Sequence, residues 1–419
     1  MIKNFSQLSK QNSVRLKALK IINEGLKAIS PSFVFKEKIK LIDNKLLIES
    51  KVYDLNNYKN IYVIGFGKAA ASMAEEIEKI LENRIKNGLV IDIQEKKLKR
   101  IKVKKGTHPY LSKKNIQASK RIINLLKNST KDDLIICLIS GGGSALFEVP
   151  YNSFIKTLKI NQRLLKCGAS IQEINTIRKH ISRVKGGQLL KFTSARIISL
   201  IFSDVPGDNL DIIASGPTVL DKSTIKDAKR IIEKYKLPSL HILETPKSQK
   251  LFQRVDNFII LNNQYPLEKM KKKAEEIGFN SKIITCQFHG EVKQAIKKIV
   301  HWAQEIKKNE LCLLAGETTV EVKGRGKGGR NTELALYYLK NYLPHTLFIS
   351  FASDGLDNTE AAGAIVDDST LKKFKKLNLS IDDYLNNNDS YNFFKKTNDL
   401  IFTGPTGSNV SDLILIMKH

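Results

Sequence analysis

The chain has 419 residues, 42% of them hydrophobic, and a formal net charge of +28. This length suits two or three domains with cores of their own, and the longest apolar runs are strand-sized, so neither a disordered chain nor a membrane span is expected. The polar segment 1–20 lacks the apolar stretch of a secretory signal. The four cysteines are isolated, which argues against a disulfide framework or zinc site and favours a reducing cytoplasm. We expect a cytoplasmic protein with no membrane partner.

The positive charge comes mostly from lysine, because only 12 of the 70 Lys and Arg residues are Arg. The lysines are spread over nearly every expected helix, so we predict no nucleic-acid partner and a field that attracts anionic substrates. In such a chain, an Arg indicates a need for the planar guanidinium that grips phosphate or carboxylate. Two short stretches hold four of the Arg and become candidate sites: Arg178 with Arg183, and Arg325 with Arg330.

Strand and helix signals alternate along the first half of the chain. After an amphipathic helix at 11–29, we expect strands at 60–65, 88–93, 134–140 and 197–202, and helical segments at 69–81, 114–126 and 151–191. Such alternation predicts a parallel sheet with crossover helices. We therefore expect a Rossmann-like N-terminal domain spanning 1–245.

The first candidate site follows the strand at 60–65, where a glycine turn leads directly into a helix. Gly65 and Gly67 allow the backbone to approach a phosphate closely, and Lys68 adds a cation beside it. The same spacing, with Ala70 and Asp92, also satisfies a dinucleotide-binding pattern, so an NAD(P)-dependent reductase is the alternative. A dinucleotide site has no need of Lys68.

A second glycine-rich loop follows the strand at 134–140. Consecutive glycines let backbone N–H groups converge on an anion, and two hydroxyls add donors at the carboxyl end of a parallel strand, where ligands bind. The candidates are Ser140, Gly141, Gly142, Gly143 and Ser144.

Two further stretches of the first half supply candidates. Within 175–187, Arg178 and Lys185 are candidate substrate-binding residues, whereas the lone His180 is more typical of a structural role. Beyond the strand at 197–202, Asp204 and Asp208 lie four residues apart in a turn. That pattern suits Mg²⁺, which takes few protein ligands and keeps water and substrate phosphates around it.

A proline-containing segment at 237–250 is the expected domain boundary. Beyond it we expect a smaller α/β domain spanning 246–419. Its strands are predicted near 257–261, 281–286, 311–314, 318–322, 346–352 and 413–417. The predicted fold class is therefore α/β with two domains.

The strongest local pattern lies at 316–333. Four glycines and three cations at 324–330 precede a helix, which predicts a loop that wraps closely around polyanionic groups. Two more polar loops, 353–357 and 403–409, also follow predicted strands. The candidates from these segments are Glu317, Gly326, Gly328, Gly329, Arg330, Asn331, Asp354 and Asn409.

Taken in order, these motifs resemble the glycerate 2-kinase family, whose C-terminal part is the MOFRL domain, here about 310–415. Between Val63 and Asp412 they read GFGKAA, SGGGSAL, EINTIRKHISRVKGG, SDVPGD, IASGPT, GETTVEVKGRGKGGRN, SDGLD, AAGAIVDD and TGPTGSNVSDL. The resemblance implies a monomeric or homodimeric enzyme that uses Mg²⁺ to transfer the γ-phosphoryl group of ATP to D-glycerate, giving 2-phosphoglycerate. It assigns Lys68 and Arg330 to catalysis, where they stabilise charge on the transferred group.

The chain departs from the family pattern in two places. The acidic residue that usually follows His108-Pro109 is missing, and the segment 357–361 is one residue shorter than usual and lacks its Gly and Pro. A shift in substrate preference would follow from the second departure. The alternative, a nicotinamide-dependent hydroxypyruvate reductase, has no use for the glycine- and arginine-rich loop at 324–330.

Overall fold

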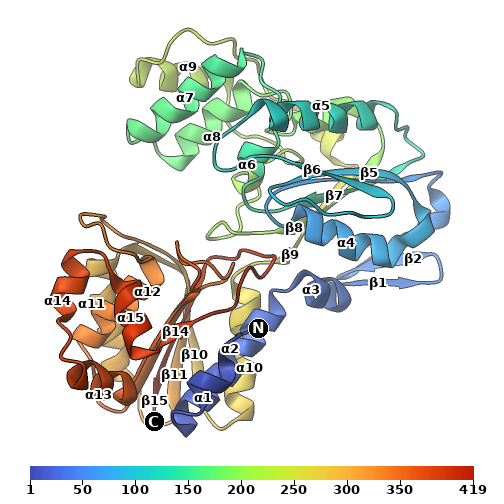
Figure 1. The fold of residues 1–419 in the computed structure, drawn as a ribbon. Helices are drawn as coiled ribbons and strands as arrows, with labels where there is room; N and C mark the ends of the chain where they lie inside the picture. The colour runs from blue at the N-terminus through green and yellow to red at the C-terminus, as the bar shows by residue number, and fades with distance from the viewer. The chain divides into compact units, whose positions relative to one another are not determined.

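The computed structural model describes all 419 residues and divides them into two compact units, coloured along the chain in Figure 1. The N-terminal unit is Val34–Ile260, and the C-terminal unit is Leu261–His419 together with Met1–Phe33. Each unit contains one six-stranded sheet, and the α/β fold class is confirmed.

The sheet of the N-terminal unit has the strand order β6-β5-β4-β7-β8-β9. Its strands are β4 Ile61–Phe66, β5 Ile85–Asp92, β6 Ile101–Lys105, β7 Leu134–Ile139, β8 Arg196–Phe202 and β9 Val255–Leu261. The pairs from β6 to β8 are parallel, and β4 and β7 are buried at every position because helices cover both faces. The chain order reverses between β4 and β7, so the carboxyl ends of these strands flank the point at which open α/β sheets bind ligands.

Helices and one small sheet complete the N-terminal unit. The helices are α3 Pro31–Lys38, α4 Ala70–Leu81, α5 Lys113–Lys127, α6 Gly143–Leu146, α7 Phe154–Lys166, α8 Ile171–His180 and α9 Ile225–Lys234. A hairpin sheet joins β1 Ile39–Ile42, β2 Lys45–Ile48 and β3 Lys51–Asp54. Helices α7, α8 and α9 share a separate apolar core and lie together at the top of Figure 1. The predicted helical stretch 151–191 is thus broken, because Gly168 takes a positive φ that ends α7.

The C-terminal unit is built on a mixed sheet with the order β10-β11-β15-β12-β13-β14. Its strands are β10 Asn280–Glu291, β11 Glu310–Thr319, β12 Thr346–Ala352, β13 Gly363–Val366, β14 Leu400–Ile401 and β15 Asp412–Lys418. Its helices are α1 Phe5–Ser9, α2 Ser13–Ala28, α10 Gln264–Glu276, α11 Val292–Glu305, α12 Arg330–Lys340, α13 Asp368–Lys376, α14 Ile381–Asn386 and α15 Ser390–Thr397. The main core lies between the sheet and helices α11, α12 and α15, whereas α2 packs with α10.

The boundary between the two units does not lie at residue 245, where the sequence predicted it. Strand β9 belongs to the first sheet, and Phe252 and Val255 pack against its core, so the N-terminal unit continues to Ile260. Helix α2, the expected amphipathic helix, packs in the C-terminal unit instead, where its buried Arg15 forms ion pairs with Asp367 and Asp399. These contacts join residues hundreds of positions apart, which local patterns do not report.

Several strands differ from those predicted. Strand β6 was not expected because its lysines mask it, as charged side chains do on an edge strand. The hairpin sheet and β13 were also missed. Strand β11 is one continuous strand where two were expected, at 311–314 and 318–322.

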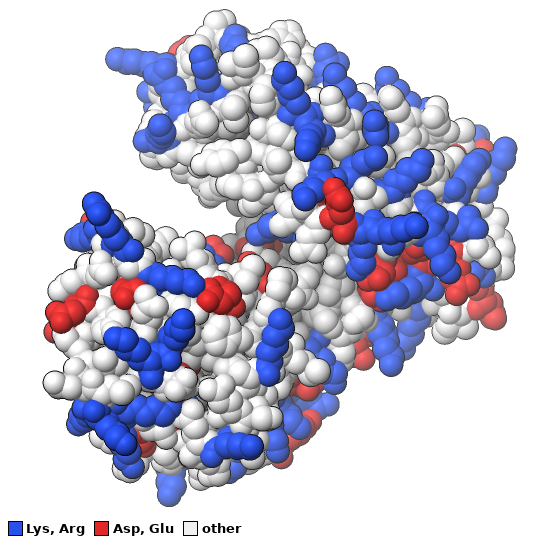
Figure 2. Space-filling model, viewed as in Figure 1, with Lys and Arg blue, Asp and Glu red and all other residues white.

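The surface charge is dispersed on the face drawn in Figure 2. Lys and Arg side chains are spread over it with Asp and Glu among them. None of the helices combines the length and apolar character that a bilayer crossing requires.

Candidate functional site

Two loops of the N-terminal unit interlock at the carboxyl ends of β4 and β7. The Lys68 N–H donates to the Gly141 carbonyl (2.8 Å), and Ser140 Oγ accepts from the Ala69 N–H (3.0 Å). Gly67 has a φ of +134°, and a Cβ there would lie 2.2 Å from Ser140 Oγ, so this position requires glycine. The sequence-predicted candidates of both loops are therefore brought together.

Gly65 has a different role from the other glycines. A Cβ at this position would lie 2.9 Å from the Leu138 carbonyl oxygen on the neighbouring strand. Gly65 is inside β4, so its lack of a side chain allows close pairing of β4 with β7. Contact between Gly65 and a ligand stays a prediction.

Lys68 lies at the surface of these interlocked loops. A Cβ built on Gly142 would lie 3.1 Å from Lys68 Cγ and 2.9 Å from His108 Cδ2, so all three residues are neighbours. Burial, and then the charge of Lys68, lower the pKa of His108. The Lys68 ammonium group forms no hydrogen bond or ion pair within the protein, which leaves its three donors for a ligand.

Asp204 lies against the same glycine loop. A Cβ on Gly141 would lie only 2.0 Å from Asp204 Oδ2, so the missing side chain of Gly141 makes room for this carboxylate. Asp208 lies in the next turn, with a φ of +55°, and its N–H donates to the Val205 carbonyl. No three His, Cys, Asp or Glu side chains cluster closely enough to hold a metal by themselves. One carboxylate beside a phosphate-type loop fits Mg²⁺, which is commonly held by one or two carboxylates and substrate phosphates.

Arg178 and Ser144 line one cavity of about 150 Å³. Arg178 Nε donates to Asn161 Oδ1 (3.0 Å), and burial lowers the pKa of Arg178 against the opposing effect of Glu148. Ser144 Oγ lies 2.9 Å from the hydroxyl of Ser215. The structure thus places two predicted substrate-binding residues, one from each of two motifs, around the same small space.

Lys185 is completely buried. Its ammonium group donates to the Phe147 carbonyl (2.8 Å) and to Glu148 Oε2 (2.7 Å). Any influence of Lys185 on a ligand therefore passes through Glu148, which the sequence analysis did not select.

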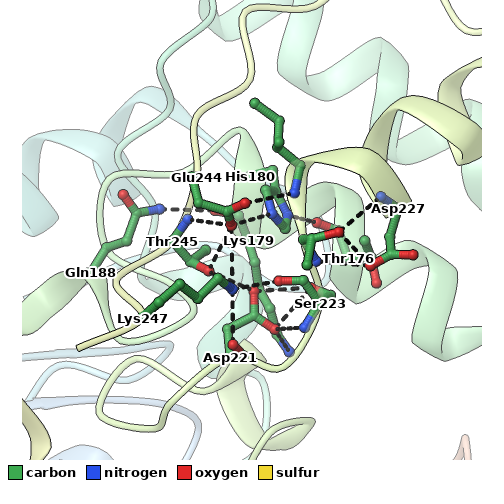
Figure 3. Close-up of polar contacts among 12 residues, drawn as sticks. Thr176, Lys179, His180, Gln188, Asp221, Ser223, Asp227, Glu244, Thr245 and Lys247 are labelled. Carbon is green, nitrogen blue, oxygen red and sulfur yellow. Dashed lines mark hydrogen bonds and ion pairs between the residues drawn. The ribbon is translucent and has the colours of Figure 1, made fainter. Parts of the chain in front are cut away.

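A buried polar network that sequence reasoning missed holds α8 in place (Figure 3). Lys179 is 2% exposed and forms ion pairs with Asp211 and Asp221. His180 Nδ1 lies 2.8 Å from the Thr176 carbonyl oxygen, and its Nε2 lies 3.3 Å from Glu244 Oε1. Groups of the protein thus engage both ring nitrogens of His180, which fits the structural role predicted for it. The network matters to the site because α8 also carries Arg178.

In the C-terminal unit, Arg330 begins α12 and is held by two carboxylates. Its Nε and Nη2 donate to the two oxygens of Asp412 (2.5 and 2.9 Å), and Nη2 also donates to Glu317 (2.8 Å). Burial alone would lower the pKa of Arg330, but hydrogen bonding and charge from Asp412 raise it. Burial raises the pKa of Asp412 to about 7, although Arg330 opposes this. Nη1 has no protein partner and remains available.

The glycine-rich loop 324–329 packs against the protein's own chain. Several of its N–H groups donate to segment 387–389, among them Gly324 to Asn388 Oδ1 (2.9 Å) and Gly326 to the Asn387 carbonyl (2.8 Å). A Cβ on Gly328 would lie 2.4 Å from Ser390 Oγ. The loop was expected to wrap around a polyanion, but its glycines have a packing role and many of its amides are already used. Ligand contact by Gly326 and Gly328 stays a prediction.

The start of α12 is capped by Asp357, another residue the analysis of motifs did not select. Its carboxylate accepts from the N–H groups of Asn331 (3.0 Å) and Thr332 (2.8 Å), and a Cβ on Gly329 would lie 2.1 Å from the Asp357 carbonyl oxygen. Burial raises the pKa of Asp357. The side chain of Asn331 is 1% exposed and bonds internally to Asp357 and Ser350.

The last two candidates lie on loops that contact each other. The Thr406 N–H donates to the Asp354 carbonyl (3.1 Å), which joins loops 353–357 and 403–409. Asp354 Oδ1 accepts from the Leu356 N–H (3.1 Å), and Asn409 Oδ1 accepts from the Ser411 N–H (3.1 Å).

Comparison with known proteins identifies the family. The model described as "Domain of unknown function (DUF4147)" matches residues 17–244, and the "MOFRL family" model matches 310–412. A glycerate 2-kinase of Pyrococcus horikoshii is 38% identical, covering 96% of this chain and 97% of its own length. A D-glycerate 2-kinase of Thermotoga maritima is 36% identical, covering 96% and 98%. The chain belongs to the glycerate 2-kinase family.

The three-dimensional fold is also similar to that of a solved member of the glycerate 2-kinase family. The crystal structure of a glycerate kinase from Thermotoga maritima matches with a TM-score of 0.87 at 35% identity, covering 97% of this chain and 100% of that one. The resemblance drawn from the ordered motifs is therefore confirmed. The region of the chain that matches the MOFRL family model includes both Arg330 and its partner Asp412.

Proposed function

We propose that the protein is a glycerate 2-kinase, which transfers the γ-phosphoryl group of ATP to D-glycerate. The observation that carries this proposal is Lys68, a cation with no partner in the protein, held by interlocked glycine loops where the strand order of a parallel sheet reverses. Phosphoryl transfer depends mainly on positioning and on charge stabilisation, and such a lysine supplies both.

The other candidates take complementary roles. Arg178 and Ser144 bind the carboxylate and hydroxyl groups of the acid in their shared cavity. Asp204 supplies an oxygen ligand for Mg²⁺, which when bound neutralises phosphate charge. Arg330 donates its free Nη1 to the transferred group, while Asp412 and Glu317 orient the guanidinium.

The alternative function, an NAD(P)-dependent hydroxypyruvate reductase, is disfavoured by Asp92. A reductase would need this carboxylate for the ribose hydroxyls. Asp92 is 1% exposed, and its oxygens already accept from the N–H groups of Ala71 (2.8 Å) and Gln94 (3.0 Å). Its position therefore suits the start of α4 better than a ribose.

One pair of assays tests the proposal. Purified protein with Mg²⁺, ATP and D-glycerate should form ADP, and the product should be consumed directly by enolase, which accepts 2-phosphoglycerate but not the 3-isomer. NADH with hydroxypyruvate should show no oxidation. Oxidation of NADH without turnover of ATP would reverse the ranking of the two functions.

We further propose that the enzyme acts in the cytoplasm as a monomer or homodimer on small molecules alone. The dispersed surface charge supports the expectation that nucleic acid is not a partner.

A further inference from the structure

Glu148 carries a buried oxygen that no group of the protein satisfies. The residue is 3% exposed, and its Oε2 accepts from Lys185 Nζ (2.7 Å), whereas Oε1 is buried and has no hydrogen-bond partner. Leaving a buried acceptor unpaired costs about 1–3 kcal/mol, and more for a charged group. Native proteins keep few such atoms without a functional reason.

Arg178 is the counterpart of Glu148 in the same cavity. Only its Nε bonds to the protein, through Asn161, so both terminal nitrogens are free. Arg178 and Glu148 interact electrostatically but form no ion pair or hydrogen bond with each other. Two opposite charges therefore line one cavity without direct contact. A ligand that bridges them needs an anionic end for Arg178 and a hydrogen-bond donor for Glu148.

The size of the cavity selects a small ligand. Its volume of about 150 Å³ is roughly five times the ~30 Å³ that one water occupies in the liquid. Sites for drug-sized ligands usually measure about 300–1,000 Å³. A three-carbon hydroxy acid suits this space, whereas a nucleotide does not.

We propose that Glu148 is a specificity-determining residue whose Oε1 accepts a hydrogen bond from the non-reacting C3 hydroxyl of the acid, while Arg178 binds the carboxylate. This inference rests on the proposed glycerate kinase function. The partner is assigned as the C3 hydroxyl and not the reacting C2 hydroxyl, and D-lactate distinguishes the two because it keeps the C2 hydroxyl and lacks the one at C3. Lys185 is a positioning residue, since its bond to Oε2 leaves Oε1 for the ligand.

Glu148 thus recognises one hydroxyl group of the substrate. A site built to bond a substrate hydroxyl discriminates strongly against an analogue without it, because the buried partner is then left unpaired. D-Lactate is D-glycerate without the C3 hydroxyl. The wild-type enzyme should therefore bind D-glycerate much more tightly than D-lactate, and Glu148 should be the reason.

The test compares Glu148→Gln with the wild type by calorimetric binding of both acids and by kinetics with D-lactate as competitive inhibitor. In the variant, Lys185 keeps the amide oxygen and an NH₂ group takes the place of Oε1. Affinity and kcat/KM for D-glycerate should fall roughly tenfold or more, as expected for loss of a charge-assisted hydrogen bond. Affinity for D-lactate should change by less than about threefold. The KM for ATP should stay the same.

Two further variants keep the result interpretable. Glu233→Gln, an exposed position on α9, is the matched control and should behave as the wild type. If Glu148→Gln fails to fold, the double variant Glu148→Leu with Lys185→Met removes the buried pair with apolar side chains, which proteins often tolerate. It should show the same loss of preference for D-glycerate.

The outcomes separate this inference from the proposed function. Equal losses for both acids in a folded variant, or an unchanged preference for D-glycerate, would overturn the role of Glu148 while kinase activity of the wild type still stands. A wild type that forms no ADP with D-glycerate overturns the proposed function instead.

Discussion

Arg330 and Asp412 face each other through two hydrogen bonds, from Nε to Oδ2 (2.5 Å) and from Nη2 to Oδ1 (2.9 Å). Asp412 is 3% exposed, whereas about a third of the Arg330 side chain is exposed. The carboxylate therefore fixes the plane of the guanidinium and leaves Nη1 unpaired. Asp412 is a positioning residue for whatever anion Arg330 meets.

Arg330→Lys should lower kcat by about tenfold or more, because one ammonium group cannot hold Asp412 with two bonds and also reach a phosphoryl group. The measurement is steady-state ADP release, with circular dichroism to check the fold. Arg121→Lys, at an exposed position of α5, is the matched control. Near-wild-type turnover of Arg330→Lys would move the catalytic assignment to Arg325 or Lys327.

Lys68→Ala should lower kcat in the same direction, because the free ammonium group beside the glycine loop is lost. The control is Lys79→Ala on α4, where the lysine pairs only with Glu76 on the surface. The loss of transition-state stabilisation is calculated from kcat/KM for each variant. For the double variant with Arg330→Lys, this loss should be smaller than the sum of the losses in the two single variants if both residues serve one transition state. Strict additivity would show that they act independently.

Arg15→Met should destabilise the C-terminal unit by about 3–5 kcal/mol, because it leaves the buried Asp367 and Asp399 without their partner. The single tryptophan, Trp302, packs against the core of this unit, so its fluorescence in urea reports this unfolding. Lys20→Met, at an exposed position of α2, is the control and should change stability little. An equally small effect of Arg15→Met would mean that the ion pairs contribute nothing net.

The stability of the C-terminal unit should decline below pH 4. Burial by itself would raise the pKa of Asp367, but the hydrogen bond and charge of Arg15 lower it from 3.8 to about 2. A lowered folded-state pKa gives stability that is full above the ordinary pKa and is lost as the pH falls through the folded value. Between pH 4 and 2 this loss is about 2 kcal/mol.

Asp367→Asn isolates that contribution. The wild type should lose stability more steeply than the variant between pH 4 and 2, measured by Trp302 fluorescence in urea at each pH. Parallel pH profiles for the two proteins would assign the acid sensitivity to other carboxylates.

Binding to nucleic acid should be weak and without sequence preference at about 0.15 M salt, despite the charge of +28. The reason is that the lysines are dispersed among carboxylates on the surface, as the face in Figure 2 illustrates. Fluorescence anisotropy with labelled duplex and single-stranded probes measures this. Tight binding that persists in high salt would contradict the argument from composition.

The sequence determined the features that depend on neighbouring residues. The apolar runs of β4 and β7 and the glycines that follow them predicted a parallel sheet with polar loops at its strand ends. This was possible because strand burial and turn formation both depend on residues that are close together in the sequence. The rarity of Arg directed attention to Arg178 and Arg330, and in the structure each keeps at least one terminal nitrogen without a protein partner, while their roles stay predictions. The motifs in order also identified the family.

Only the tertiary structure decided which residues meet across the fold. Arg330 and Asp412 are 82 residues apart, Lys185 and Glu148 are 37 apart, and Arg15 and Asp367 are 352 apart. Each pair forms because the chain path brings one buried charge next to its opposite, and burial of either charge alone would be too costly. No local spacing encodes that path. The same holds for loop 324–329, whose glycines were predicted to approach a polyanion. In the structure these glycines allow the loop backbone to pack closely against segment 387–390.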